Sequence, residues 1–291
     1  MAIQCCFERY EKKYCLTLSQ QRFLLERMTP YMKKDAYGEY TICNIYYDTD
    51  DYRLIRASLE KPVYKEKLRV RSYGVPQEDG KVFVELKKKF DGVVYKRRIT
   101  MDIQNVEPFL SGELPSENFG QIGREIGYFQ SFYQTVPKVF IGYDRLAFAG
   151  IDDPQLRITF DTNLRWRDTD VDLRLGDHGA PIALPCGDVL MEVKIPGACP
   201  LWLSHLLSDA QAFPTSFSKY GEAYLACEGK AAPKAYREQV AFDEAMRGEQ
   251  ERSRDWPQDG QLLELSSSTR AADTAVANSL ASQLSNIVIG A

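Results

Sequence analysis

Residues 64–99 read YKEKLRVRSYGVPQEDGKVFVELKKKFDGVVYKRRI, and this stretch decides the fold. From Lys65 to Arg71, basic residues recur at every second position, so on an extended strand they share one face. Turn signals at residues 77–80 and 91–92 separate this run from two further alternating runs. The pattern therefore predicts three consecutive antiparallel strands with basic residues on one common surface.

The excess positive charge of this stretch has to be balanced by negative charge. From Lys61 to Arg98 the chain carries twelve Lys or Arg residues against five Asp or Glu residues, whereas the whole chain has a net charge of −4. Like charges on neighbouring strands repel, so a group of opposite sign should lie between them. One interpretation is a meander with a basic face in water. The other is a groove or tunnel that holds a chain of phosphates, because Lys and Arg both bind phosphate oxygens.

The composition is that of a soluble globular protein. With 291 residues, 44% of them hydrophobic, the chain can bury a sizeable core in one large domain or two small ones. A pI near 5.5 argues against general affinity for nucleic acid. The first residues are charged, and no apolar run approaches the roughly 20 residues that span a bilayer. We therefore expect no signal peptide, no transmembrane segment and a cytoplasmic location.

The residues available for metal binding restrict the chemistry. The seven cysteines are odd in number and form no C-x-x-C pair, so disulfides and zinc sites are not expected. Only His178 and His205 could serve a histidine-based metal site or a Ser-His-Asp arrangement. Any metal should therefore be a hard cation held by carboxylates and phosphate oxygens.

Five further segments alternate charged and apolar residues, which brings the predicted strands to about eight. They cover residues 7–16, 40–48, 138–148, 156–161 and 189–195, with residues 164–173 as a connection. Their charged faces can converge, which inverts an ordinary small barrel and requires apolar cover outside. Predicted helices supply this cover, at residues 19–32, 52–59, 121–133, 200–212 and 217–227. The fold class is α+β, an eight-stranded antiparallel β-tunnel with a charged interior and helices outside.

Three segments fall outside this alternation. Residues 48–51, DTDD, resemble a calcium loop, but the spacing of an EF-hand is absent and a turn or helix cap is favoured. Residues 105–120 contain two prolines and two glycines and are expected to form a loop. Residues 229–291 have too little apolar surface to offset their chain entropy, so we expect a domain at 1–228 followed by an unstructured tail.

Eight short motifs, in this order, resemble the VTC (vacuolar transporter chaperone) polyphosphate polymerase domain. This domain belongs to the triphosphate tunnel metalloenzymes, also called the CYTH superfamily, and the resemblance spans about Phe7 to Cys227. The motifs are RYEKKY (9–14), NIYYDT (44–49), LRVRSY (68–73), VELK (84–87), YDRLAF (143–148), LRITFD (156–161), MEVK (191–194) and SFSKY (216–220).

The resemblance implies a fold, a reaction and a set of site residues. The fold is an eight-stranded antiparallel tunnel, and the reaction transfers the terminal phosphoryl group of ATP to a growing polyphosphate chain. The implied catalytic residues are Arg69, Arg71, Lys87, Arg145 and Arg157. The implied substrate-binding residues are Arg9, Lys13, Lys67, Lys96, Arg98, Lys194 and Lys219. Glu192, together with Glu11, would hold a divalent cation, Mn2+ or Mg2+.

Two departures from the superfamily patterns bear on the reaction. Many hydrolases and cyclases begin with an E-x-E-x-K strand, but here Arg9 replaces the first acid, which favours the polymerase branch and one main metal ligand. The polymerase motif K-F-S-K has Ser216 in place of its first lysine. A triphosphate hydrolase and a non-catalytic polyphosphate-binding module remain as alternatives. The sequence also leaves open whether a separate membrane partner carries the product away.

Overall fold

The protein is described from a computed structural model, which covers residues 10–91, 93–185 and 187–229. Arg9 and the predicted tail, apart from Gly229, lie outside the described residues. In the part of the chain that the structure describes, no helix is long and apolar enough to cross a membrane.

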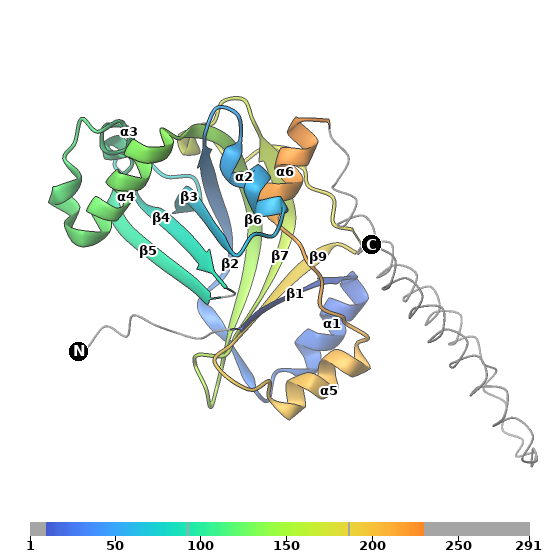
Figure 1. Cartoon of the computed structure of the whole chain (residues 1–291). Coiled ribbons are helices and arrows are strands. Elements are labelled where there is room, and N and C mark those ends of the chain that lie inside the picture. The colour runs from blue at the N-terminus through green and yellow to red at the C-terminus, as the bar shows by residue number, and fades with distance from the viewer. Residues whose placement is uncertain (1–9, 92, 186, 230–291) are drawn as a thin grey trace, which may run out of the picture. The chain divides into compact units, whose positions relative to one another are not determined.

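Eight antiparallel strands form one sheet in the order β1-β9-β7-β6-β2-β3-β4-β5, and the short strand β8 pairs with β7 (Figure 1). The strands are β1 (Tyr10–Leu16), β2 (Met32–Asp48), β3 (Tyr64–Tyr73), β4 (Lys81–Phe90), β5 (Val93–Asp102), β6 (Val136–Gly150), β7 (Arg157–Arg167), β8 (Ala180–Pro181) and β9 (Val189–Ile195). The predicted three-stranded meander is therefore confirmed as β3, β4 and β5.

The sheet curls round until strands from its two ends face each other. Strands β1 and β4 lie far apart in the order of the sheet, yet Lys87 Nζ of β4 is 3.8 Å from Glu11 Oε2 of β1. Figure 1 shows β1 and β9 crossing below the β3-β4-β5 meander. The charged side chains therefore lie on an enclosed inner face, which confirms the antiparallel α+β fold with a charged interior.

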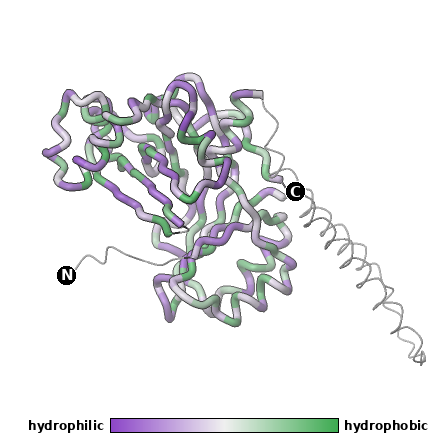
Figure 2. The backbone as a smooth tube through the Cα atoms, in the orientation of Figure 1, coloured by the Kyte–Doolittle hydropathy of each residue, from purple (hydrophilic) through white to green (hydrophobic). Residues whose placement is uncertain are grey.

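Strict alternation keeps the two faces of the meander chemically different. Leu68, Val84 and Leu86 are fully buried on the outer face, whereas their neighbours in sequence, all charged except Phe83, point inward. The same alternation is visible as changing colour along these strands in Figure 2. Burying a leucine or valine side chain contributes about 1.5–3 kcal/mol, so a one-residue slip of register would be strongly unfavourable.

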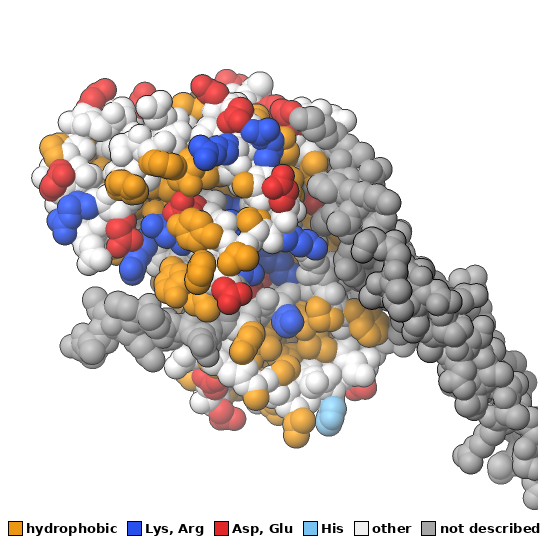
Figure 3. All heavy atoms as spheres, in the orientation of Figure 1, with side chains coloured by type: hydrophobic (Ala, Val, Ile, Leu, Met, Phe, Trp, Pro, Cys, Tyr) orange, Lys and Arg blue, Asp and Glu red, His pale blue; other side chains and the backbone are white. Residues whose placement is uncertain are grey.

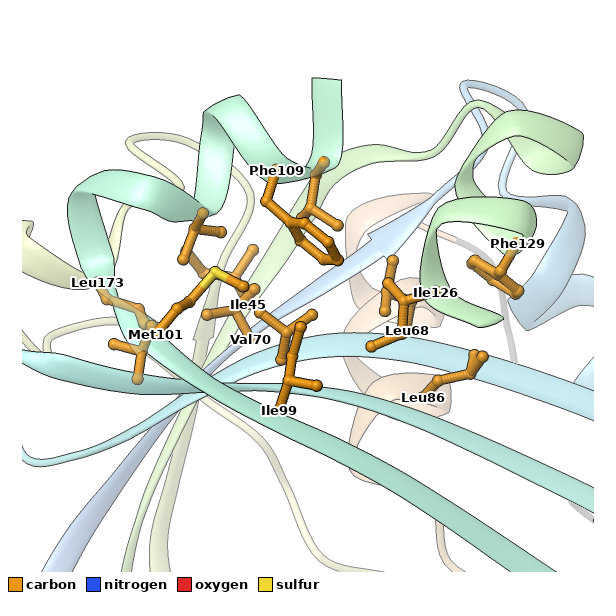
Figure 4. Close-up of a cluster of buried hydrophobic side chains, with 14 of the residues drawn as sticks. Ile45, Leu68, Val70, Leu86, Ile99, Met101, Phe109, Ile126, Phe129 and Leu173 are labelled. Atoms are coloured by element: carbon orange, nitrogen blue, oxygen red, sulfur yellow. The ribbon is translucent and has the colours of Figure 1, made fainter. Parts of the chain in front are cut away.

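Three apolar clusters lie between the sheet and the helices that cover it. The helices are α1 (Leu18–Arg27), α2 (Arg53–Leu59), α3 (Val106–Ser111), α4 (Gly120–Tyr133), α5 (Leu201–Asp209) and α6 (Lys219–Cys227). Helices α3 and α4 pack Phe109, Ile126 and Phe129 on the meander (Figure 4). Helix α6 packs Tyr220 against Tyr46 on the inner side, at one end of the sheet. Helices α1 and α5 cover β1, β7 and β9 from outside. This outer cover holds the curl that the inner charges oppose.

The predicted loop at residues 105–120 is wrong, because much of it is helical. The 3₁₀ turn Ile103–Asn105 leads into α3, and a second 3₁₀ turn spans Ser116–Phe119. Pro108 lies in the first turn of α3, where its missing N–H has no cost, and Gly112 ends that helix with a φ of 86°. Proline and glycine here mark helix ends rather than a loop.

Other predicted boundaries also shift. Helix α1 is capped by Thr17 in a capping box with Gln20, not by Ser19, and it ends at Arg27 rather than near residue 32. Strand β2 begins at Met32, eight residues before the predicted start, and residues 164–167 belong to β7 rather than to a connection.

Asp48 joins two helices at one end of the sheet. Its buried carboxylate accepts hydrogen bonds from the backbone N–H groups of Leu54 (2.8 Å) and Ile55 (3.0 Å) at the start of α2. It also accepts one from the hydroxyl of Tyr220 (2.9 Å) in α6. The acidic turn therefore acts as a helix cap, as the sequence favoured, and it fixes the helix that carries Lys219.

We predict that Asp48→Ala lowers the free energy of unfolding by about 3 kcal/mol, because it leaves several buried donors without a partner. Urea denaturation monitored by circular dichroism measures this. Asp50→Ala, at an exposed position of the same turn, is the control and should lower the free energy of unfolding by less than about 0.5 kcal/mol. Equal effects of the two changes would mean that Asp48 does not join the helices.

Candidate functional site on the inner face of the sheet

The inner face of the meander carries its charges in rows across the strands. In one row, Lys67 of β3 lies opposite Lys87 of β4, which lies opposite Lys96 of β5. In the next row, Glu85 lies between Arg69 and Arg98. One row therefore consists only of cations, whereas its neighbour contains its own counter-charge.

Glu85 is the centre of the first of two ionic clusters. Only 1% of its side chain is exposed, and it accepts from Arg69 Nη2 at 2.8 Å, Arg98 Nε at 2.6 Å and Lys96 Nζ at 2.7 Å. Burial raises its pKa, but these cations and Arg71, at 4.0 Å, together hold the pKa far below its ordinary value. Part of the opposite charge expected between the strands is therefore supplied by the protein itself.

Two of the arginines near Glu85, Arg69 and Arg71, have further fixed partners. Arg69 donates to the Tyr46 hydroxyl at 3.1 Å. Arg71 donates to Asn44 Oδ1 at 3.0 Å and to the Tyr143 hydroxyl at 3.2 Å. Burial alone would lower the pKa of Arg69, but its acidic and phenolic neighbours raise it, so this guanidinium stays charged. These arginines are held in place before any ligand binds.

The second ionic cluster joins β6, β7 and β9 to α6. Arg145 donates to both oxygens of Asp161, at 2.6 and 2.7 Å, and Lys219 Nζ lies 2.7 Å from Asp161 and 3.2 Å from Glu192. Arg145 also lies 3.5 Å from Glu192, and Lys13 lies 3.8 Å from it. Lys219 is the first residue of α6, whose N-cap Ser218 accepts from the backbone N–H of Gly221. The helix start therefore sets the position of this lysine.

Glu192 remains ionised within this cluster. Burial raises the pKa of its carboxyl group, but Lys219, Lys13, Arg145 and Lys194 together lower it well below the ordinary range. The same attraction to Asp161 and Glu192 outweighs burial and raises the pKa of Lys219. The ionised carboxylates and the charged Lys219 thus stabilise one another.

A group of lysines has too little counter-charge, in contrast to the arginines. We define this lysine cluster as Lys13, Lys65, Lys67 and Lys87. Burial, followed by repulsion from the three other members, lowers the pKa of Lys67 to about 7. The pKa values of Lys65 and Lys87 are lowered as well, again chiefly by burial. The lysine cluster is therefore the part of the inner face that would gain most from a bound anion.

Lys13 donates to the backbone carbonyl of Phe217 at 2.8 Å, whereas the partners of Lys67 and Lys87 are weak. Lys67 Nζ is 3.3 Å from Ser218 Oγ, and Lys87 Nζ is 3.8 Å from Glu11. Figure 3 shows Lys and Arg side chains in the recessed middle of this face, between hydrophobic side chains above and below. The cations are therefore partly shielded from water but not sealed off from a ligand.

Most of the predicted site residues that the structure describes are brought together, and Arg157 stands apart. Arg157 faces the same side as Asp161 but lies near Asp35, at 3.8 Å, away from both clusters, with 42% of its side chain exposed. Lys194 lies opposite Glu11 on one side and Arg157 on the other. Arg9 lies outside the described residues. Arg98, predicted to bind substrate, is engaged by Glu85.

Sequence reasoning gave no role to Glu85, Asp161, Tyr46 or Tyr143. The available signal was parity: Glu85 shares a strand face with Lys87, and Asp161 shares one with Arg157. An acid on a basic inner face has to be paired, but its partners come from other strands and could not be assigned from local spacing.

The two predicted metal ligands lie close together. Glu11 of β1 is opposite Lys194, and Glu192 of β9 is opposite Lys13, so the two carboxylates are diagonal neighbours on adjacent strands. Within the described ranges, no group of three or more His, Cys, Asp or Glu residues could hold a metal ion. Two carboxylates completed by phosphate oxygens and water are nevertheless a donor set that suits Mg2+ in phosphate sites.

Comparison with known proteins places these features in a family. A sequence model described as the VTC domain matches residues 8–227. The chain is 26% identical over 231 residues to the vacuolar transporter chaperone complex subunit 4 of Schizosaccharomyces pombe, and 24% identical over 280 residues to that of Trypanosoma cruzi. These matches cover 65% and 77% of this chain but only 32% and 34% of the relatives. The chain thus spans about a third of their length.

Two solved structures are more distant matches. A putative adenylate cyclase from Bacillus halodurans has a TM-score of 0.45 and 15% identity, over 72% of this chain and 92% of that one. A putative adenylyl cyclase from Hippeastrum with a dominant triphosphatase activity has a TM-score of 0.43 and 16% identity, over 77% of this chain and 97% of that one.

We predict that Glu85→Gln lowers the free energy of unfolding at pH 7 by about 3 kcal/mol, because it leaves buried guanidinium groups without their counter-charge. The neighbouring cations lower the pKa of Glu85 in the folded state, so its stabilisation is complete above the unfolded value of 4.5 and declines below it. Denaturation at pH 7 and at pH 3 should therefore show a smaller difference between parent and variant in acid.

The control is Glu125→Gln, which removes a more exposed ion pair with Arg97 (3.1 Å). It should cost less than about 1 kcal/mol. If Glu85→Gln were as mild as this control, the carboxylate would not be what holds the arginines together.

Proposed function

Because this chain belongs to the VTC domain family, we propose that it is a polyphosphate polymerase, which transfers the terminal phosphoryl group of ATP to the end of a polyphosphate chain along the inner face of the sheet. The observation that carries the proposal is the lysine cluster. Its members lie opposite or beside one another without enough acid to neutralise them. A linear polyanion supplies evenly spaced negative charge to such a row.

The two ionic clusters support different proposed tasks for the cations. Arg69, Arg71 and Arg145 are already held by acidic, amide and phenolic partners, so they present fixed N–H donors. Fixed donors stabilise charge that develops during a reaction without having to reorganise. The lysine cluster would instead bind and neutralise the phosphates of ATP and of the chain. Lys96 and Lys219, which carboxylates already hold, and Lys194 would line the same path.

The transfer itself needs alignment more than acid or base catalysis. A terminal polyphosphate oxygen forms a bond to the γ-phosphorus of ATP, while the bond from that phosphorus to the β,γ-bridging oxygen breaks and ADP leaves. The attacking oxygen is already ionised, so no proton has to be removed from it. Phosphoryl transfer passes through a loose transition state, for which in-line positioning and charge neutralisation supply most of the catalysis.

Glu192 and Glu11 are the residues that would hold a divalent cation, Mn2+ or Mg2+. Lysines and an arginine surround Glu192, so a cation would enter most favourably together with the phosphate oxygens that offset this positive charge. When bound, such a cation neutralises charge on the transferred phosphoryl group.

Triphosphate hydrolysis is the second candidate, and the pair Glu11 and Glu192 favours it. Hydrolysis would use a second carboxylate to orient water, and Glu11 is diagonal to Glu192 on the next strand. In the structure, however, Glu11 faces Lys87, which together with other cations lowers the pKa of Glu11 despite the effect of burial. An ionised Glu11 paired with a lysine is better suited to balancing charge than to taking a proton.

We predict that the protein with ATP and Mn2+ forms ADP and long-chain polyphosphate, visible on a polyacrylamide gel. Lys87→Met should reduce the rate by roughly a hundredfold, because it removes one cation from the phosphate path. Lys88→Met is the matched control: Lys88 is next in sequence, points outward and lies 3.6 Å from Glu66, so its variant should keep the parental rate.

The products separate the alternatives. Free phosphate without polyphosphate would identify a hydrolase. Binding of tripolyphosphate without any turnover would identify a binding module. Equal loss of activity in the Lys87 and Lys88 variants would contradict a reaction on the inner face.

A further inference from the structure

Thr159 contains an unexplained buried hydroxyl. Among the described residues, Thr159 Oγ1 is the one buried side-chain nitrogen or oxygen that has no hydrogen-bond partner. The residue is 6% exposed. Buried hydroxyls in folded proteins are nearly always bonded, so an isolated exception points to a ligand that is absent from the free protein.

The position of Thr159 directs this hydroxyl to the inner face. Its neighbours Ile158 and Phe160 point outward into the apolar cluster under α1 and α5. Thr159 shares the opposite, inward side of β7 with Asp161, which binds Arg145 and Lys219. The hydroxyl therefore lies within the second ionic cluster rather than in the apolar core.

The strands on either side offer one polar neighbour. Across the ladder to β9, Thr159 lies opposite Glu192, and across the ladder to β6 it lies opposite Ala147, whose methyl group cannot bond. Directly opposed residues have Cβ atoms about 4.5–5.5 Å apart. The hydroxyl oxygen and the Glu192 carboxylate therefore border the same space, but they are not hydrogen-bonded to each other.

The chemistry of this space favours a cation over a phosphate oxygen as the missing partner. The inner face is rich in N–H donors for phosphate but poor in oxygen ligands for a cation, because arginine and lysine hold Glu85 and Asp161 at 2.6–2.8 Å. The ion pairs of Glu192 are longer, at 3.2–3.8 Å, which leaves this carboxylate more accessible to a cation. A threonine hydroxyl adds a neutral oxygen ligand to a hard divalent cation, as it does for Mg2+ in P-loop proteins.

We propose that Thr159 Oγ1 is a further oxygen ligand, in addition to the carboxylates of Glu192 and Glu11, of a divalent cation of the Mg2+ or Mn2+ class. This inference rests on the proposed function in that it assumes a phosphate-bound cation at Glu192. It assigns to Thr159 a role that neither the motif pattern nor the ion pairs of the free protein would indicate.

The test measures how much Mn2+ increases the affinity for tripolyphosphate. Tripolyphosphate is titrated calorimetrically into the full chain, once with EDTA and once with saturating Mn2+, and the ratio of the two dissociation constants is compared between variants.

Thr159→Val removes the oxygen at nearly constant volume, and we expect it to reduce this ratio on the order of tenfold. Thr159→Ser keeps the oxygen and should retain the parental ratio. Thr100→Val, which makes the same change at an exposed threonine on the inner side of β5, is the control and should also retain it.

The melting temperature and the affinity for tripolyphosphate in EDTA distinguish a metal ligand from a structural residue or a phosphate contact. Thr159→Val should leave the melting temperature of the free protein unchanged or higher, because it removes an unsatisfied hydroxyl, and it should bind tripolyphosphate normally in EDTA. An unchanged Mn2+ effect in Thr159→Val would overturn the inference, as would weaker binding already in EDTA, which would make the hydroxyl a phosphate contact. A lower melting temperature with an unchanged Mn2+ effect would make Thr159 structural. If the parent protein bound no tripolyphosphate either in EDTA or with Mn2+, the proposed function itself would fail.

Discussion

The inner face of the curled sheet encloses more positive charge than its own carboxylates can neutralise, and the rest of the structure depends on this imbalance. Glu85 and Asp161 each hold two or more cations at hydrogen-bonding distance, so the arginines are fixed and charged. The lysine cluster lacks such a centre, and the pKa of Lys67 falls to about 7 as a result of burial and of the neighbouring lysines. The protein therefore keeps one part of its interior pre-organised and leaves another part with uncompensated positive charge.

The apolar exterior makes this interior possible. Repulsion between opposed lysines favours an open, flat sheet, whereas the clusters under α3 and α4 and under α1 and α5 hold the strands in a curl. Asp48 joins α2 to α6, which in turn places Lys219 between Asp161 and Glu192. The inner cations are thus positioned by hydrophobic packing on the outer side of the strands and by helix capping at one end of the sheet.

Much of the fold follows from alternation alone. The period of two in β3, β4 and β5 predicted the strands, their order and the separation of charged from apolar faces, because one slip of register would expose every apolar side chain. The helix α3 was missed because Pro108 and Gly112 are turn signals whose meaning depends on their position in a helix. The cap at Thr17 was missed because Ser19 offered an equally good local signal.

The pairing within the site was less predictable. The sequence indicated which cations share a face, but the partners of Glu85 and Asp161 come from strands and helices far apart in the chain, for example Lys219 with Asp161. The orphan hydroxyl of Thr159 depends on Glu192 and Ala147 being its neighbours across the sheet, which no local spacing indicates.

The most direct test of the central claim is the titration of Lys67, followed by NMR of lysine side chains labelled with carbon-13 and assigned with Lys67→Met. We expect a pKa of about 7 in the free protein and a rise towards the ordinary lysine value of about 10.4 when tripolyphosphate is bound, because a bound anion favours the charged ammonium. Tripolyphosphate affinity should accordingly fall as pH rises above 7, since Lys67 must then take up a proton on binding. An ordinary pKa for Lys67 in the free protein, unchanged by tripolyphosphate, would contradict the claim that the inner face carries uncompensated positive charge that binds a polyanion.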